Sequence, residues 1–370
     1  MNILVTGGAG FIGSHLVDAL VAAGHQVRIL DAVVPQVHGN RLPPHLNRNA
    51  EFLQGDMCDP ELVERALDDI DAVFHHAAEV GVGQSMYQIT RYVRANTFGT
   101  AVLLQALADR RHQVRKLIVA SSMSIYGEGA YECANCGPVY PQSRSIQQLQ
   151  EHRWDAECPT CGSPLMSVPT KETKPLFPGS VYAIGKQDQE QLCLVVGRAY
   201  GIPTIAFRYW NVYGPRQALS NPYTGVCAIF SSRLLNDQPP MIFEDGEQMR
   251  DFVHVSDIVQ ANLLALETDA ADDQALNIGS GETISIRRIA ALLAAGLGKS
   301  IEPIVTNKYR EGDVRHCVAD ITRARTLLGY KPRVMLQQGM PELLEWVRSQ
   351  TANDGVEMAM AELAARQLAR

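Results

Sequence analysis

Thr6-Gly7-Gly8-Ala9-Gly10-Phe11-Ile12-Gly13 follows the short apolar run Asn2-Ile3-Leu4-Val5, and this stretch decides the fold of the chain. The apolar run predicts a buried parallel strand, and an amphipathic helix is expected over residues 11–23. Glycines at positions 7, 10 and 13 allow a tight turn and a close approach of the backbone to a pyrophosphate at the helix N-terminus. Residues 26–30 predict a second strand that ends at Asp31. The spacing is that of a dinucleotide-binding βαβ unit.

Asp31 favours NAD over NADP, because its carboxylate would accept hydrogen bonds from ribose hydroxyls and would repel a 2′-phosphate. Asp56 is placed to reach the adenine amine. Strands and helices continue to alternate after this unit, which predicts an α/β fold with a Rossmann-type doubly wound parallel sheet and ligands at the carboxyl ends of its strands. The expected strands are 51–56, 72–78 and 116–121, and the expected helices are 60–67 and 92–108.

The overall composition limits the classes of function. The chain has 370 residues and a formal charge of -7, so it offers no broad basic face for nucleic acid. No apolar run approaches the ~20 residues of a membrane span, and the N-terminus enters a strand without the features of a signal peptide. We therefore expect a cytoplasmic protein with no nucleic-acid or membrane partner.

Tyr182-Ala183-Ile184-Gly185-Lys186 places a phenol and an amine four residues apart. In a helix the two side chains lie on one face, one turn apart. A neighbouring ammonium favours the phenolate and lowers the pKa of the tyrosine, as a general base requires. With Ser122 at the end of a preceding strand, the pattern predicts the oxidation of an alcohol by a nicotinamide cofactor.

Several further motifs occur in order along the chain, and together they resemble the extended short-chain dehydrogenase/reductases that act on nucleotide sugars. The resemblance covers nearly the whole chain apart from one insertion. It rests on the glycine turn, His76-Ala77-Ala78, Asn96-Thr97-Phe98-Gly99-Thr100, Ser121-Ser122-Met123-Ser124-Ile125-Tyr126-Gly127, Tyr182 with Lys186, Arg208-Tyr209-Trp210-Asn211-Val212-Tyr213-Gly214-Pro215-Arg216, Arg250-Asp251-Phe252-Val253-His254-Val255 and Arg310-Glu311-Gly312-Asp313-Val314.

The resemblance implies a role for each matching residue. Ser122, Tyr182 and Lys186 correspond to the catalytic set, and Ser122 also to the substrate site. Paired N–H donors of arginines suit a diphosphate, so the implied nucleotide clamp comprises Asn211, Arg250, Arg310 and Asp313. The implied cofactor site comprises Gly7, Gly10, Phe11, Ile12, Gly13, Asp31, Asp56, Met57, His76, Ala77, Ala78, Asn96, Ser121, Tyr182, Lys186, Tyr209 and Val212.

Met123 and Ser124 discriminate between the reactions of this family. The 4,6-dehydratases carry an Asp-Glu pair at these positions, because they need an additional acid and base. Neither Met nor Ser can serve, which favours a 4-epimerase that oxidises C4, turns the 4-keto sugar over and reduces it again. Residues 220–226, together with the cysteine-containing insertion, resemble the bacterial dTDP-L-rhamnose 4-epimerases. A UDP-glucuronate or UDP-glucose-type 4-epimerase, a net dehydrogenase or reductase, and a non-catalytic NAD-binding regulator remain as alternatives.

Four of the eight cysteines form two Cys-x-x-Cys pairs about 20 residues apart, each followed by glycine. This spacing predicts a closed tetrahedral zinc site of structural type, with two disulfides or a redox pair as the alternatives. The polar segment around it needs such a staple to fold, and its place in the chain suggests a lid or wall over the substrate cleft. The expected ligands are Cys133, Cys136, Cys158 and Cys161.

The expected domain organisation follows from these motifs. Residues 1–127 and 170–207 form the NAD-binding domain, with a return helix near 255–278, and residues 128–169 form the zinc insertion. Residues 208–254 and 279–350 form a smaller α/β nucleotide-sugar domain. Residues 351–370 are expected to be an Ala-rich amphipathic helix. Members of the resembled family dimerise through helices equivalent to 92–108 and 182–201, so we expect a homodimer.

Overall fold

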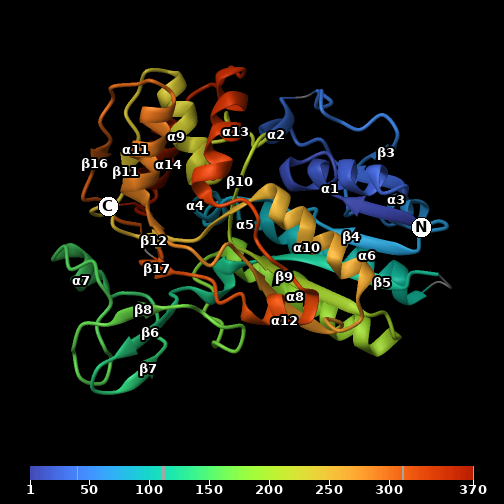
Figure 1. The fold of residues 1–370 in the computed structure, drawn as a ribbon, viewed down its shortest axis with the longest axis horizontal. Coiled ribbons are helices and arrows are strands. Elements are labelled where there is room, and N and C mark those ends of the chain that lie inside the picture. Colours follow the sequence, from blue (N-terminus) through green and yellow to red (C-terminus); the bar gives the residue numbers. More distant parts are fainter. Residues whose placement is uncertain (40, 110–112, 311, 370) are drawn as a thin grey trace.

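A seven-stranded parallel sheet forms the centre of the computed structural model, which describes residues 1–39, 41–109, 113–310 and 312–369 (Figure 1). All neighbouring strands pair in parallel. Within the described residues, no helix is long and apolar enough to cross a bilayer. The strand order is β14 (Gln274–Ile278), β9 (Thr204–Tyr209), β5 (Lys116–Ser122), β4 (Ala72–His75), β1 (Asn2–Thr6), β2 (Gln26–Asp31) and β3 (Glu51–Gln54).

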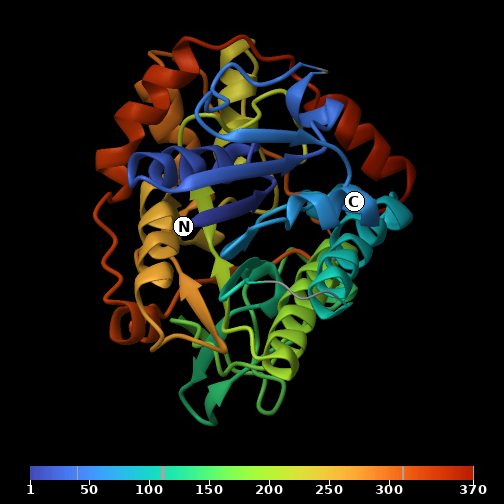
Figure 2. The same ribbon diagram turned by 90° about the vertical axis from the view of Figure 1, so that its right-hand side faces the viewer.

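Helices cover both faces of the sheet (Figures 1 and 2). Side chains alternate along each strand, so Ile3 and Val5 of β1 pack on one face and Leu4 packs on the other. The predicted doubly wound sheet is thereby confirmed. The first face carries α1 (Phe11–Ala22), α10 (Val255–Glu267) and α12 (Thr322–Leu328), and the second carries α3 (Pro60–Ala66), α6 (Gly99–Asp109) and α8 (Val181–Tyr200).

A second, smaller core lies beside the carboxyl edge of the sheet. It is built mainly from α9 (Val226–Leu235), α11 (Ile286–Gly296) and α13 (Leu336–Arg348), with short strands around them. The expected division assigned residues 279–350 to this part, whereas residues 321–330 pack into the core of the large sheet. The short strands are β10 (Asn211–Tyr213) with β13 (Phe252–His254), β11 (Met241–Ile242) with β16 (Ile304–Val305), and β15 (Ile284–Ser285), β12 (Met249–Arg250) and β17 (His316–Cys317).

The cysteine-containing insertion forms a separate projection, at the lower left of Figure 1. Its three strands are β6 (Ala130–Cys133), β7 (Gly137–Val139) and β8 (Met166–Val168), in the order β7-β6-β8, and α7 (Ile146–Gln150) lies in the connection between β7 and β8. The strands are antiparallel, so the chain enters through β6 and leaves through the neighbouring β8.

Two expected helices differ from the observed elements. The helix expected over 92–108 is α5 (Ile89–Tyr92), a π-helical segment η1 (Val93–Phe98) and then α6. The C-terminal helix expected over 351–370 is only α14 (Val356–Ala365), and the Asp354 carboxylate accepts from its first amide, Val356 N, at 3.0 Å; residue 370 lies outside the described residues. The remaining short elements are α2 (Pro35–His38), α4 (Val82–Ser85) and η2 (Met123–Tyr126).

Candidate active site

A cavity of about 960 Å³ lies at the carboxyl edge of the sheet, where it meets the smaller core. All but one of the residues implied for cofactor and substrate line this cavity, among them Asp31, Ser122 and Arg250. The exception is Asn96. Its side chain is fully buried in η1, and it binds both Glu79 N (2.7 Å) and Glu79 O (3.1 Å). Asn96 therefore holds the loop after β4 from behind the cavity.

The glycine turn leaves an open cradle at the start of α1. Gly7 has φ +70°, and a Cβ at this position would lie 2.8 Å from Ala77 N. A Cβ at Gly13 would lie 2.2 Å from the carbonyl oxygen of Gly7. Only glycine fits at these positions, and the backbone is left bare toward the cavity, as a dinucleotide pyrophosphate requires.

Asp31 lies at the carboxyl end of β2 and also lines the cavity. One carboxylate oxygen accepts from Ala9 N at 3.0 Å, and the other accepts from Val33 N at 2.8 Å. These bonds fix the carboxylate beside the glycine turn, where a ribose would meet it. The residues present therefore fit the adenosine half of NAD.

His76 and Tyr209 line the cavity beyond β4 and β9. Burial lowers the pKa of His76 to about 4, so its ring is neutral, and its buried Nδ1 has no hydrogen-bond partner among the described residues. Asn262 on α10 donates to the Tyr209 hydroxyl at 2.7 Å. The hydrogen-bonded Tyr209 and the neutral ring of His76 thus line the part of the cavity that lies between the two cores.

Ser122 and Tyr182 meet at the centre of the cavity. Ser122 ends β5, and its Oγ accepts from Ser124 N (3.2 Å) and from Ser124 Oγ (3.0 Å). Burial raises the pKa of Tyr182, and a hydrogen bond with Ser122 acts in the opposite direction. Tyr182 N donates to Ser85 Oγ at 3.0 Å, which ties the start of α8 to α4. The three hydroxyls of Ser124, Ser122 and Tyr182 thus form one connected group.

Lys186 lies one turn further along α8 and is buried. Its ammonium donates to Ala120 O (2.7 Å) and to Gln189 Oε1 (2.9 Å), and burial lowers its pKa to about 7. We expected Lys186 to lower the pKa of Tyr182. That direction is wrong for the protein without a ligand, because the burial of the phenol is the larger effect on Tyr182.

The sequence analysis missed a buried network behind this group. The Gln189 amide donates to Ala77 O at 3.2 Å and to Thr100 Oγ1 at 2.9 Å, and Thr100 Oγ1 also contacts His75 Nε2. The network joins α8 to β4, which ends at His75 immediately before His76. Gln189 lies three residues after Lys186 on the same helical face, and this spacing was the available signal. The Ser121 hydroxyl does not point to the cavity alone, since it donates to Glu190 Oε2 at 2.7 Å.

The residues implied for the nucleotide converge from β10, β12 and the loop before β17. The Arg310 guanidinium donates to Asp313 Oδ2 at 2.8 Å and lies 4.5 Å from the centre of the Phe243 ring. Arg250 donates to the backbone carbonyls of Val314 and Arg315, and the Asn211 amide donates to Asp251 O at 2.9 Å. Burial would raise the pKa of Asp313, but the charges of Arg310 and Arg250 outweigh it and lower that pKa. Glu311 of the same motif lies outside the described residues.

One wall of the cavity comes from segments to which the sequence analysis gave no role. Val80 and Val82 face the cavity and are half exposed, and α14 adds Val356, Ala359, Met360 and Leu363. A Cβ on Gly83 would be 3.4 Å from Leu363, so α14 packs directly on α4. The Arg366 guanidinium lies 4.5 Å from the centre of the Tyr87 ring and holds the end of the helix. This wall is apolar.

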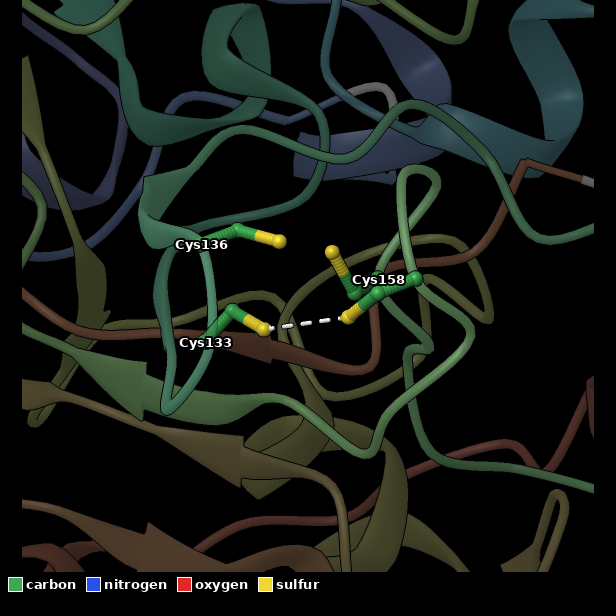
Figure 3. A group of neighbouring side chains, drawn as sticks. Cys133, Cys136 and Cys158 are labelled. Carbon is green, nitrogen blue, oxygen red and sulfur yellow. Dashed lines mark hydrogen bonds between the residues drawn. The ribbon is translucent and has the colours of Figure 1, made fainter.

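The four paired cysteines of the insertion come together in space, and Figure 3 shows the thiols of Cys133, Cys136 and Cys158 directed toward one another. All four Sγ atoms lie within 4.8 Å of one another, and Cys133 Sγ is 3.6 Å from Cys161 Sγ. Four thiolates around one zinc ion would be ~3.8 Å apart. The glycines after each pair, Gly137 and Gly162, have φ +75° and +72°, as the two tight turns require. Hydrogen bonds with Ser163 lower the pKa of Cys161 to about 6. The cluster fits a tetrahedral metal ion.

The insertion was expected to form a lid or wall of the cleft. This expectation is wrong, because the cavity lining includes no residue of the segment 128–169, all of which the structure describes. The insertion instead contacts the loop that carries Asp313, because Arg144 donates to Asp313 O at 2.9 Å.

Known proteins match the chain over most of its length. The sequence model of the NAD dependent epimerase/dehydratase family matches residues 3–144, and that of GDP-mannose 4,6 dehydratase matches residues 162–343. A dTDP-L-rhamnose 4-epimerase of Burkholderia thailandensis is 35% identical, over 94% of either chain.

Two solved structures have similar folds. The UDP-glucose 4-epimerase of Thermotoga maritima, solved with UDP-glucose, is 35% identical with a TM-score of 0.75, and the match covers 94% of this chain and 99% of that one. The UDP-glucuronic acid 4-epimerase of Bacillus cereus, solved with UDP-glucuronic acid and NAD, is 30% identical with a TM-score of 0.77 and the same coverage.

Proposed function

The chain belongs to the NAD-dependent nucleotide-sugar epimerases of the extended short-chain dehydrogenase/reductase family, and we propose that it converts dTDP-L-rhamnose into dTDP-6-deoxy-L-talose. One observation carries the proposed reaction. Met123 and Ser124 follow Ser122 in the wall of the cavity. Neither residue supplies a carboxylic acid beside the hydroxyls of Ser122 and Tyr182. Ser122 and Tyr182 therefore support oxidation and re-reduction at a single carbon.

Bound NAD would take the hydride from C4 and return it. Tyr182 is the proposed base for the C4 hydroxyl proton, and Ser122 holds the same oxygen. The Ser124 hydroxyl, 3.0 Å from Ser122 Oγ, orients Ser122. Lys186 would bind the nicotinamide ribose hydroxyls when NAD is bound, and its protonated form would favour the phenolate of Tyr182. Arg250 and Arg310 hold the diphosphate while the 4-keto sugar turns, and Tyr182 then protonates the oxygen at C4.

A 4,6-dehydratase must also remove a carbon-bound proton and protonate a leaving hydroxyl, which takes an additional acid and base. Met123 cannot titrate, and Ser124 is engaged with Ser122. The match to a dehydratase model covers residues 162–343, beyond these two positions. This match concerns the nucleotide-sugar half of the chain and does not include residues 123 and 124.

The apolar wall supports a 6-deoxy sugar as the substrate. A C6 methyl group against Val82, Met360 and Leu363 would gain roughly 0.8 kcal/mol of burial. A uronate carboxylate would need a cation, and Arg91, which also lines the cavity, is already paired with Glu79 at 2.9 and 2.8 Å. The similarity to the Burkholderia enzyme points the same way.

UDP-glucuronate and UDP-glucose are the second candidates, favoured by the similarity to the two solved epimerases. Proton NMR of the purified protein with each of the three nucleotide sugars, without added cofactor, separates the possibilities. We expect a new anomeric signal that reaches a fixed ratio with dTDP-L-rhamnose and is lost in Tyr182→Phe. Turnover only with stoichiometric NAD or NADH would indicate a net redox enzyme. No turnover with any sugar, in protein that still binds NAD, would indicate the non-catalytic regulator.

Zinc is the proposed ion of the four-cysteine cluster, in a structural role. Support comes from the converging thiols and the two glycine turns. Elemental analysis of the purified protein should give one zinc per chain. Cys158→Ser should lose the ion and lower the melting temperature, and Cys227→Ser, at a buried cysteine outside the cluster, should keep the ion. A zinc-free protein with two disulfides by mass spectrometry would refute the proposal.

A homodimer through α8 and η1 is also proposed. The two elements lie side by side, and they expose Val93, Phe98, Ile184 and Val195. Ile184 and Val195 are eleven residues apart on α8, so they share one face. Light scattering coupled to size exclusion should give twice the chain mass, and Val195→Glu should give the mass of one chain. A wild-type protein with the mass of one chain would contradict the proposal.

A further inference from the structure

The insertion is joined to the nucleotide clamp by buried polar contacts although it contributes nothing to the cavity lining. The clamp consists of Asn211, Arg250, Arg310 and Asp313. Its Arg310–Asp313 pair faces the cavity. The backbone carbonyl of Asp313 faces the insertion, where the Arg144 side chain donates to it.

The Arg144 guanidinium donates hydrogen bonds to three separate parts of the chain. One terminal nitrogen donates to Asp313 O at 2.9 Å and to Glu244 Oε1 at 2.8 Å, and the other donates to Trp154 O at 2.9 Å. Its side chain is only 3% exposed. A planar fork of fixed donors suits this geometry, because it sets the angle between the groups as well as their distance. Arg144 therefore fixes the backbone of Asp313 relative to the insertion.

A second set of charged groups holds Arg315, two residues after Asp313. The Glu128 carboxylate, at the base of the insertion, accepts from Arg315 N at 2.6 Å and lies 3.7 Å from the Arg144 guanidinium. The Arg315 guanidinium in turn donates to Asp155 Oδ1 at 2.9 Å and to Glu244 Oε2 at 3.2 Å. Arg315 also makes a bidentate pair with Asp245 at 2.6 and 2.9 Å, and Asp155 is largely exposed. The buried charges of Glu128, Arg144 and Glu244 therefore depend most on one another.

An apolar contact completes the link to the cysteines. Trp154 and Leu149 of the insertion form a small buried cluster with Tyr309, which immediately precedes Arg310. The Trp154 and Tyr309 rings are 6.5 Å apart at their centres. Only three residues separate Trp154 from Cys158, whose loop is closed by the bond from Cys158 N to Ser163 O at 2.8 Å. A fixed conformation of the cysteine loop therefore restrains the positions of Trp154 and Asp155.

We propose that the four-cysteine insertion is a support for the nucleotide clamp, with Arg144 as its positioning residue. The inference rests on the proposed role of Arg310 and Asp313 in binding the nucleotide diphosphate. An ion at the cysteines orders the segment that carries Trp154 and Asp155, Arg144 then fixes Asp313, and the Arg310–Asp313 pair is presented to the nucleotide. The insertion acts on affinity for the nucleotide and leaves the chemistry at C4 unchanged.

The test is calorimetric titration of the NAD-loaded protein with dTDP and with UDP, which needs no turnover. Arg144→Met should weaken the nucleotide that the wild type binds by about tenfold. Retained NAD and kcat at saturating sugar nucleotide should stay within about twofold, so the loss appears in KM. Arg153→Met is the matched control, because Arg153 is in the same insertion but pairs only with Glu151 and Glu157 at the surface.

Wild-type affinity in Arg144→Met, or an equal loss of NAD and nucleotide, would overturn the inference. Should Arg144→Met fail to fold, Trp154→Leu and chelator-treated wild type replace it, and unchanged nucleotide affinity in both would overturn it as well. A wild type that binds neither dTDP nor UDP would refute the proposed function itself. The two failures are thereby distinguishable.

Discussion

The cofactor end and the sugar end of the cavity are lined in different ways. At the cofactor end, the backbone of the glycine turn and the strand ends forms the surface, and a Cβ at Gly13 would strike Gly7 O at 2.2 Å. At the sugar end, residues from four distant parts of the chain form it. They come from 79–83, 221–229, Arg310 with 312–314, and 356–363. The first surface is set by main-chain geometry, and the second depends on how separate helices and loops pack.

This difference determines what each end tolerates. A backbone surface cannot be adjusted by exchanging side chains, so it suits a ligand that is the same throughout a family. A side-chain wall can be altered at one position without changing the sheet behind it, so it suits the part of the substrate that varies. Tyr182 and Lys186 lie between the two ends and serve both.

The largest effect on activity is expected at Tyr182, between the cofactor end and the sugar end of the cavity. Tyr182→Phe should lower kcat by ~1000-fold, because it removes the only proposed base, while retained NAD and nucleotide affinity stay near the wild-type values. NMR-monitored turnover and the NAD content of the purified protein measure this. Tyr200→Phe, at the exposed end of the same helix, should behave as wild type. Turnover within tenfold of wild type in Tyr182→Phe would remove Tyr182 from the proposed chemistry.

Gly13→Ala tests the backbone end. The added methyl cannot fit beside Gly7 O, so NAD affinity should fall by roughly 100-fold, measured by fluorescence titration with NADH. Gly10→Ala is the paired variant, because its Cβ would lie 3.3 Å from the same oxygen at an ordinary φ of -74°, and its loss should be under about tenfold. Equal effects of the two substitutions would show that crowding of the turn does not govern cofactor binding.

Met360→Lys tests the side-chain end. A charge in the apolar wall should lower kcat/KM for dTDP-L-rhamnose by about tenfold and shift the preference toward UDP-glucuronate, with no change in NAD affinity. Met358→Lys is the control, because Met358 is on the same helix but is 71% exposed and outside the cavity lining. If both variants keep the wild-type preference, α14 has no part in sugar selection.

The last effect is on stability and concerns Lys186 and pH. Burial lowers its pKa from 10.5 to about 7, so between pH 7 and 10 the unfolded chain binds more protons than the folded one, and the free energy of unfolding rises with pH. Between pH 7 and 9 the wild type without NAD should gain about 2 kcal/mol relative to Lys186→Met. Urea denaturation at both pH values measures the gain. Lys331→Met, at an exposed position, should follow the wild type, and a Lys186→Met curve parallel to the wild type would contradict a neutral buried amine.

Prediction from sequence succeeded where one local segment determines the structure. The glycine turn with its strand and helix, the Tyr182–Lys186 spacing and the Cys-x-x-Cys pairs each lie within a few residues, so periodicity and turn chemistry suffice. Asn96 lies in the π-helical segment η1 and outside the cavity lining, and the apolar pattern of 92–108 reveals neither fact. The wall from α14 and the bond from Arg144 to Asp313 join residues far apart in the chain, and neither has a pattern in the sequence.

The base of the insertion has a consequence for how such a segment is gained and kept. Ala130 and Val168 are paired on neighbouring antiparallel strands, so the two ends of the insertion lie side by side, and a segment with such ends fits into a loop without rearranging its surroundings. Removing it is a different matter. Arg315 would keep its pair with Asp245, but the buried Glu244 carboxylate would lose Arg144, and Arg315 N would lose Glu128. Acquisition is structurally simple, whereas deletion would expose a charge network that has become part of the host domain.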